Sequence, residues 1–208
     1  MAQVPLCRFP TCILAKTVVL GDSISKGKIL TVLAQKVCIV GEFSVGKTSL
    51  IRRYVLGLFS EDYKATLGVN CYNHAGQFLH PVTGETQAMN MVLWDIEGGQ
   101  QKSSMLNTYL IGAAGALLIA DLTRPETIDA LDHYYSLLES VIPGRPKVLA
   151  LNKFDLMDGS PAMIQTLSQA QAKATALGLR LVQTSASRGN QVPELFGGLA
   201  SDILRLRG

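Results

Sequence analysis

One octapeptide constrains the fold of this chain more than any other segment. Residues 41–48, GEFSVGKT, fit the pattern G-x-x-x-x-G-K-[ST]. The apolar residues 36–40 before it indicate a buried strand, and residues 49–56 after it indicate a helix. A glycine loop between a strand and a helix gathers backbone N–H groups and the positive end of the helix dipole. The sequence therefore predicts a phosphate site, at which Lys47 reaches the β- and γ-phosphates and the Thr48 hydroxyl binds Mg²⁺.

The composition excludes several classes of protein. Hydrophobic residues make up 48% of the 208 residues and charged residues 17%, which suits a buried core and argues against disorder. The formal net charge is +3 and no basic run occurs, so we expect no nucleic-acid partner. The four cysteines lack metal-binding spacing and fit a reducing, cytoplasmic location. We expect no transmembrane segment and no lipid anchor, because no apolar stretch is long enough and no lipidation motif is apparent.

Strand-like and helix-like segments alternate from about residue 34, which is typical of a parallel α/β sheet. Two segments joined by a turn predict a hairpin, residues 68–75 and 87–95. Apolar runs predict further strands at 115–121, 147–152 and 179–185. Helices are expected between these strands and at the end of the chain, over 125–141, 161–177 and 192–207. Ligands of such sheets bind beyond the carboxyl ends of the strands, where the motifs of this chain fall.

A second motif, NKFD at residues 152–155, directly follows a predicted strand. The Asp155 carboxylate can accept two hydrogen bonds, from N1–H and the exocyclic amine of guanine, and adenine has no such donor pair. Asn152 is expected to tie this loop to the phosphate loop, and the stem of Lys153 to pack over the base. Three residues at the end of the last predicted strand can offer backbone N–H groups to the guanine carbonyl, namely Ser185, Ala186 and Ser187.

Five motifs occur in a fixed order, GEFSVGKTS, FSEDYKATLGV, WDIEGG, NKFD and TSAS, and together they resemble the small GTPases of the Ras superfamily, in particular the Rab branch. The resemblance extends from about Ala34 to Arg207. It implies a three-layer α/β/α fold of the P-loop NTPase type, with a mostly parallel six-stranded sheet and one antiparallel edge strand. It also implies a Ras-like GTPase domain over residues 34–208, which leaves residues 1–33 as an N-terminal extension of open role.

The resemblance also implies roles for individual residues. Phe59 takes the place of an aromatic residue that stacks on guanine, and Tyr63 that of a tyrosine in the first switch loop. Thr66 takes the place of the switch threonine that contacts Mg²⁺ and the γ-phosphate, and Asp95 that of a carboxylate that holds Mg²⁺ through water. The expected metal-binding residues are Thr48, Thr66 and Asp95. The expected catalytic residues are Gln100, Lys47 and Thr66. The expected nucleotide-binding residues are Gly41, Phe43, Ser44, Val45, Gly46, Lys47, Thr48, Ser49, Phe59, Tyr63, Thr66, Gly98, Asn152, Lys153, Asp155, Ser185, Ala186 and Ser187.

Residues 95–100, DIEGGQ, depart from the family pattern D-x-x-G-Q, whose glutamine orients the attacking water. Two registers are open. In the ungapped register Gly98 contacts the γ-phosphate and Gly99 replaces the glutamine. In the other register one extra residue is absorbed near Glu97, and Gln100 is the catalytic residue. The Glu97 carboxylate would also repel the γ-phosphate unless it turned outward.

Phe43 is a further departure, because the family has a small residue at this place beside the γ-phosphate. A benzyl group there is expected to crowd the water-orienting residue or an arginine from a partner. Ser187 also stands where many relatives have lysine, which is expected to weaken guanine binding modestly.

The motifs together indicate a switch that binds GTP or GDP with Mg²⁺ and hydrolyses GTP slowly. Effector, exchange-factor and activating proteins are expected to bind through the switch loops. One alternative is an interaction module that stays bound to GTP with negligible hydrolysis, which Phe43 and Gly99 favour. Another is a nucleotide kinase, but the sequence shows no arginine cluster for the lid of a second substrate.

Overall fold

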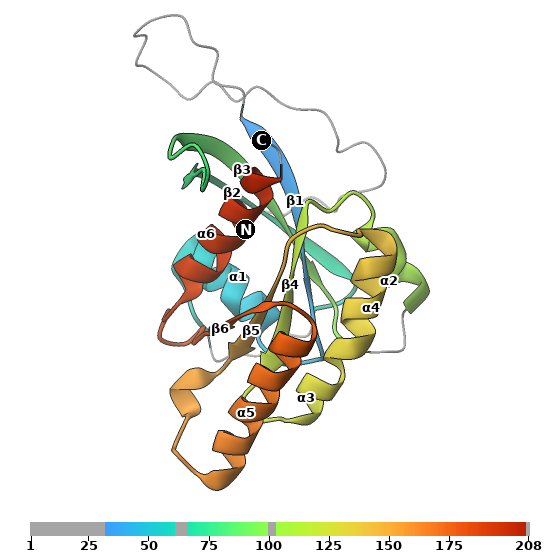
Figure 1. Cartoon of the computed structure of the whole chain (residues 1–208), viewed down its shortest axis with the longest axis vertical. Helices are drawn as coiled ribbons and strands as arrows, with labels where there is room; N and C mark the ends of the chain where they lie inside the picture. Colours follow the sequence, from blue (N-terminus) through green and yellow to red (C-terminus); the bar gives the residue numbers. More distant parts are fainter. Residues whose placement is uncertain (1–31, 61–65, 100–102, 207–208) are drawn as a thin grey trace, which may run out of the picture.

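The computed structural model of this chain describes residues 32–60, 66–99 and 103–206 (Figure 1). The described residues form one sheet of six strands in the order β2-β3-β1-β4-β5-β6. The strands are β1 (Leu33–Val40), β2 (Val69–Leu79), β3 (Thr86–Ile96), β4 (Gly115–Asp121), β5 (Lys147–Asn152) and β6 (Arg180–Gln183). Only β2 is antiparallel to its neighbour among these strands, and it lies at one edge. The predicted sheet is therefore confirmed.

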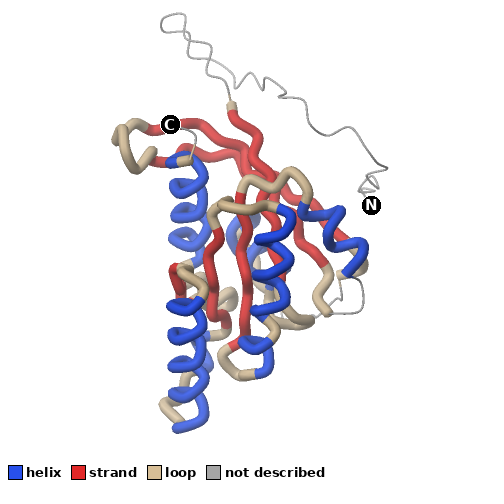
Figure 2. Tube along the Cα trace, turned by 45° about the vertical axis from the view of Figure 1, so that its right-hand side comes forward, coloured by secondary structure: helices blue, strands red, loops and turns tan. Residues whose placement is uncertain are grey.

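Helices cover both faces of the sheet, which gives three layers (Figures 1 and 2). They are α1 (Lys47–Leu56), α2 (Ser103–Leu110), α3 (Glu126–Asp129), α4 (Leu131–Val141), α5 (Pro161–Ala176) and α6 (Val192–Arg205), with a 3-10 turn, η2, at Phe154–Leu156. On one face α1 and α6 pack against the sheet, and the other face is covered by α2 to α5. No helix within the described ranges combines the length and the apolar character needed to cross a bilayer.

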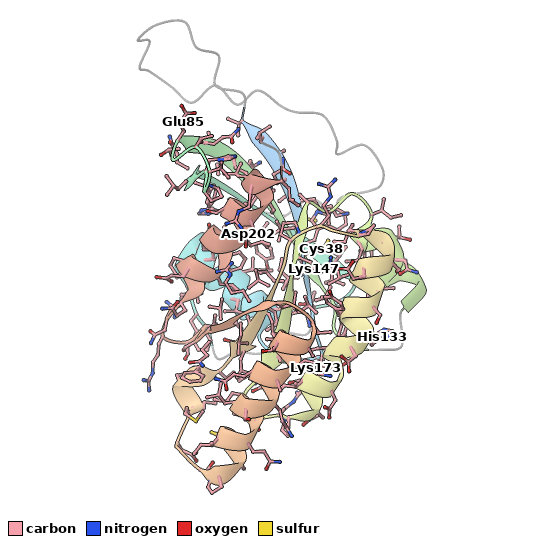
Figure 3. All side chains as sticks on the ribbon, in the orientation of Figure 1. Cys38, Glu85, His133, Lys147, Lys173 and Asp202 are labelled. Carbon is pink, nitrogen blue, oxygen red and sulfur yellow. The ribbon has the colours of Figure 1, made fainter. Side chains whose placement is uncertain are left out.

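Strand β1 shows why the sheet has an apolar core on each face. Side chains of a strand alternate between the two faces. Val37 and Ile39 belong to the core under α1 and α6, while Cys38 and Val40 belong to the core under the other helices. Figure 3 places Cys38 in the middle of the molecule, between the sheet and the helices. The apolar run of β1 therefore makes it a central strand, and the phosphate loop begins directly after its end.

The prediction of a single helix over residues 125–141 is wrong. The chain forms the short helix α3 and then α4, which meet at Ala130. The Thr127 hydroxyl donates to the carbonyl oxygen of Arg124 and holds α3 against the turn after β4. The Tyr134 N–H lies 3.5 Å from the Ala130 carbonyl oxygen, so helical hydrogen bonding is weak at the junction.

Helix α2 is an element that the sequence analysis did not predict. Leu106, Tyr109 and Leu110 are buried in the core beside Tyr134. Their spacing of three and four residues is that of one helix face, and this spacing could have predicted the helix. The other boundaries differ from the predicted ones by a few residues, and both arms of the β2–β3 hairpin are longer than expected.

Candidate functional site

Loops at the carboxyl ends of the parallel strands meet around one cleft, where ligands of such sheets bind. Most of the expected nucleotide-binding residues line it: Phe43, Ser44, Gly46, Lys47, Thr48, Ser49, Phe59, Thr66, Gly98, Asn152, Lys153, Asp155, Ala186 and Ser187. Val45 and Ser185 are buried beside these residues, and Gly41 directly follows β1. Tyr63 and Gln100 lie outside the described residues, so their predicted roles stay predictions.

The loop of residues 41–46 curls around the ammonium group of Lys47. Lys47 Nζ donates to the carbonyl oxygens of Gly41 and Glu42, at 2.8 Å each. Burial lowers the pKa of Lys47 to about 8, and the carboxylates of Asp95 and Glu42 only partly oppose that shift. Helix α1 begins at Lys47, so its unpaired N–H groups face the same cleft. A buried cation beside a helix N-terminus can bind a chain of phosphates.

Asn152 joins the phosphate loop to the loops that follow β5 and β6. Its Nδ2 donates to the carbonyl oxygen of Val45 at 2.9 Å. Its Oδ1 accepts hydrogen bonds from the hydroxyl of Thr184 and the N–H of Ala186, at 3.3 and 3.2 Å. The tie between the NKFD loop and the phosphate loop is thus present, as the sequence predicted.

Gly46 is adapted to this contact. Its φ of 97° is in the left-handed region, and a Cβ at this position would lie 2.2 Å from Asn152 Nδ2. The Gly46→Ala variant is expected to lose stability through backbone strain and through disruption of the Asn152 hydrogen bonds. Gly144→Ala is the matched control, because Gly144 has a φ of 66° but open space around it.

Denaturant unfolding of the two variants separates the effect of backbone strain from the effect of the contact with Asn152. Gly46→Ala is expected to reduce the free energy of unfolding by about 1–3 kcal/mol more than Gly144→Ala, which is the cost of buried groups left without partners. Equal losses in the two variants would show that the contact between Gly46 and Asn152 contributes nothing.

Three oxygen-bearing side chains meet beneath the phosphate loop. Thr48 Oγ1 donates to Asp95 Oδ2 at 2.6 Å and lies 2.9 Å from Thr66 Oγ1. Asp95 is completely buried, and within the described part of the chain its Oδ1 has no hydrogen-bond partner. Burial raises the pKa of Asp95, although the Thr48 hydroxyl and the charge of Lys47 oppose this. A hard cation such as Mg²⁺ prefers oxygen ligands, so this donor set fits the predicted metal.

Asp155 lies at the other end of the cleft. Its Oδ2 accepts a hydrogen bond from the Ser187 hydroxyl at 2.7 Å. Partial burial opposes ionisation, but hydrogen bonds from Ser185 and Ser187 outweigh it and hold the pKa of Asp155 below its ordinary value. An ionised carboxylate here can accept hydrogen bonds from a base with two neighbouring donors.

Lys153 is held beside Asp155 by a buried carboxylate at the end of β4. Lys153 Nζ lies 2.6 Å from Oδ2 of Asp121, whose side chain is fully buried. The backbone of Lys153 is left-handed, with a φ of 63°, so the residue leaves β5 at a sharp turn. The ion pair fixes the path of the Lys153 stem along the cleft, where the base is expected to lie.

The segment after β3 packs directly on the phosphate loop at Gly98. A Cβ on Gly98 would lie 2.6 Å from both Lys47 Nζ and Phe43 N, so only glycine fits there. The next residue, Gly99, donates its N–H to the hydroxyl of Tyr134 at 3.3 Å. This packing supports the ungapped register, because it places Gly98 at the corner of the loop beside Lys47.

Glu97 and Phe43 are the other departures from the family pattern. Glu97 Oε2 accepts a hydrogen bond from Gly68 N–H at 2.7 Å, so this oxygen is directed towards the start of β2. The side chain of Phe43 is about half exposed on the cleft wall. The expected crowding of the γ-phosphate by its ring stays a prediction.

Two arginines at the site were missed by the sequence analysis. Arg53 on α1 donates to the carbonyl oxygens of Ala186 and Ser187, and so holds the loop after β6. Arg124, after β4, donates to the carbonyl oxygen of Phe43. Neither arginine belongs to a motif. For Arg124 alone the sequence offered a reason to expect a place at the site, because Arg124 lies three residues beyond the end of a predicted strand.

Comparison with known proteins agrees with this geometry. The family model described as the Ras family matches residues 36–205. Ras-related protein Rab7 of Pisum sativum is 31% identical over 176 residues, which cover 82% of each chain. Ras-related protein Rab-13 of Mesocricetus auratus is 29% identical over 83% of this chain and 81% of its own length. Ras-related protein Rab-7b of Mus musculus is 35% identical over 59% of this chain and 61% of its own length.

Proposed function

Because this chain belongs to the Ras family and is a Rab-like small GTPase, we propose that its cleft binds GTP or GDP with Mg²⁺ and hydrolyses GTP slowly. One observation supports this most: Asn152 joins a phosphate loop built around buried Lys47 to a loop that presents the ionised Asp155. A cleft with a cation at one end and a carboxylate at the other suits a nucleotide with a guanine base. We further propose that residues 34–208 form the GTPase domain and that residues 1–33 are an extension.

The phosphates would lie along the loop between Gly41 and Lys47. Lys47 would exchange its bonds to two backbone carbonyls for bonds to phosphate oxygens, and the start of α1 would add backbone donors. Thr48, Thr66 and Asp95 would hold Mg²⁺, directly or through water. The ion would neutralise charge on the β- and γ-phosphate oxygens.

At the other end of the cleft, Asp155 would accept hydrogen bonds from N1–H and the amine of guanine. Ser187 would then release the carboxylate oxygen that it now bonds. Arg53 and Asn152 hold the loop 185–187 in place. To serve the guanine carbonyl, the Ala186 N–H would exchange its present bond to Asn152 Oδ1 for one to the base. Phe59, whose ring is partly exposed at the cleft, would stack on the base.

The proposed hydrolysis is slow because of the residue at the place of the water-orienting glutamine. The packing of Gly98 against the phosphate loop supports a register in which Gly99, which has no side chain, stands at the place of the water-orienting glutamine. Without that side chain the attacking water is poorly positioned, and an activating protein would have to supply the missing groups. The effector and exchange factors would bind at the segments around Thr66 and Gly98, which both border the phosphate end.

The register can be tested at Gln100. Under the ungapped register the Gln100→Leu variant is expected to hydrolyse GTP within about threefold of the wild-type single-turnover rate, whereas loss of a water-positioning group costs about tenfold or more. Gln101→Leu is the matched control. A tenfold fall in Gln100→Leu alone would assign the water-positioning role to Gln100.

The proposed function is tested by calorimetry with GTP, GDP and ATP in the presence of Mg²⁺, together with phosphate release in single turnover. We expect tight binding of GTP and GDP, weak binding of ATP, and slow but measurable phosphate release. The alternative, a GTP-bound interaction module, draws support from the same Gly99 geometry and predicts the same binding with no phosphate release. Equal affinity for ATP and GTP would refute both.

A further inference from the structure

One arginine that is not among the residues lining the cleft contacts the phosphate loop. Arg124 Nη1 donates to the carbonyl oxygen of Phe43 at 3.1 Å. Its Nε lies 3.1 Å from Glu126 Oε1, and the Arg124 side chain is 34% exposed against 67% for Glu126. The contact with Glu126 is a surface ion pair of the kind that adds little stability. The contact with Phe43 joins the turn after β4 to the phosphate loop, 81 residues away.

The backbone of Arg124 is fixed on both sides. Its N–H donates to the carbonyl oxygen of Asp121 at 3.0 Å, and its own carbonyl oxygen accepts from the Thr127 hydroxyl at 2.7 Å. Asp121 in turn is fully buried and accepts from the N–H of Thr123 at 2.9 Å. The turn is therefore held rigidly, and it aims the guanidinium at one carbonyl.

The carbonyl oxygen of Phe43 and the N–H of Ser44 belong to the same trans peptide group. In a trans peptide these two bonds point in opposite directions. Because the Phe43 oxygen faces Arg124, the Ser44 N–H points away from Arg124, and Ser44 is one of the residues that line the cleft. Ser44 itself has a φ of 62°, a conformation that is costly for a residue other than glycine and persists only where neighbours impose it.

We propose that Arg124 is a positioning residue for GTP hydrolysis, which orients and polarises the Phe43–Ser44 peptide so that the Ser44 N–H donates to the β–γ end of the phosphate chain. This inference rests on the proposed function. A cation on the carbonyl oxygen draws electron density from the peptide and makes its N–H a stronger donor. No movement of Arg124 is required, since the observed contact already gives the orientation.

The reaction explains why such a donor matters. A water oxygen forms a bond to the γ-phosphorus while the bond from that phosphorus to the β–γ bridging oxygen breaks. The electron pair stays on the bridging oxygen, which becomes a terminal oxygen of GDP, and the water protons leave with inorganic phosphate or to solvent. A fixed N–H donor that faces this oxygen stabilises the charge that develops there.

The test compares Arg124→Ala, Arg124→Lys and Glu126→Gln with the wild type. Arg124→Ala is expected to lower the single-turnover hydrolysis rate about tenfold, which is the effect of losing one charge-assisted hydrogen bond. Arg124→Lys keeps a cationic donor and is expected to recover most of the rate. Glu126→Gln removes only the surface partner of Arg124 and is expected to match the wild type.

Affinity for GMP separates positioning from a general structural role. GMP keeps the base, the ribose and the α-phosphate but lacks the β–γ end, so its Kd is expected to change less than twofold in Arg124→Ala. A hydrolysis rate within twofold of wild type would overturn the inference, and so would GTP and GMP affinities that fall together with the melting temperature. In either case GTP binding and turnover by the wild type would leave the proposed function standing. A wild type that binds GTP without turnover would overturn the inference and the proposed hydrolysis but leave the proposed nucleotide binding standing, and one that binds no guanine nucleotide would overturn all three.

Discussion

The Asp155→Asn variant is expected to lose its preference for guanine nucleotides. The Asp155 carboxylate offers two acceptors, whereas an amide offers one acceptor and one donor. The amide would place its N–H₂ against the guanine amine, so both hydrogen bonds to the base would be lost or strained. Since hydrogen bonds to a charged group contribute about 1.5–3 kcal/mol each, the GTP affinity should fall about 10²- to 10⁴-fold.

The same variant should gain affinity for xanthosine triphosphate. Xanthine carries a carbonyl where guanine carries its amine, so it can accept a hydrogen bond from the new amide while its N1–H donates to the amide oxygen. Competition calorimetry with GTP and xanthosine triphosphate measures both changes. The control is Asp158→Asn, three residues further on, where the carboxylate is at the surface and accepts from Ser160 N–H. A GTP affinity unchanged in Asp155→Asn would mean that another group recognises the base.

Replacement of Lys47 by methionine is expected to have an effect of similar size at the phosphate end. Lys47 is the buried cation of the loop, and burial lowers its pKa to about 8. Methionine has a similar length but neither charge nor donors. We expect GTP affinity to fall about 10²-fold or more, because a buried charge-assisted contact to phosphate is lost. GMP affinity should change far less, since Lys47 is expected to reach the β- and γ-phosphates.

In the ligand-free protein, the buried charge of Lys47 should lower the free energy of unfolding. The folded chain holds the proton of Lys47 more weakly than the unfolded chain, so the charged ammonium lowers stability at pH 7. As pH rises through about 8 towards the ordinary value of 10.5, the folded state loses this proton first and stability should rise. Lys47→Met should lack that rise.

Chemical denaturation of ligand-free protein from pH 7 to 10 tests this, as the difference between the wild type and Lys47→Met. Lys173→Met is the matched control. Lys173 on α5 pairs with Asp132 at the surface, and Figure 3 shows it on a helix of the outer layer. A parallel pH dependence of wild type and Lys47→Met would show that burial of Lys47 has no energetic cost in the ligand-free fold.

Local patterns were sufficient to predict the sheet and the two ends of the cleft. The strand that leads to Gly41 and the strand that leads to Asn152 are apolar runs that stop at a polar or glycine residue, and such runs need no knowledge of the rest of the chain. Asn152 was expected to reach the phosphate loop, and the contact with Val45 is present. These predictions succeeded because the carboxyl ends of parallel strands lie at one edge of the sheet, here those of β1 and β5 with β4 between them.

The contacts of two arginines with distant segments were not predicted. Arg53 bonds to Ala186 across 133 residues, and Arg124 bonds to Phe43 across 81. Both arginines lie on surfaces that a sequence pattern marks only as polar, and their partners are backbone carbonyls, which carry no residue-specific signal. The split between α3 and α4 has a local origin, since the Thr127 hydroxyl bonds backbone groups of the preceding turn, but these partners too carry no residue-specific signal.

The side chain of Asn152 has one further consequence. Because a single amide touches Val45 on one loop and Ala186 on another, the separation between the two recognition ends is set by the protein and not by what it binds. The cleft therefore selects nucleotides by the distance between the base and the terminal phosphates. A nucleotide whose base and terminal phosphates stand at a different spacing, such as one with a lengthened sugar–phosphate linkage, can satisfy one end only, and discrimination by length comes from the fold itself.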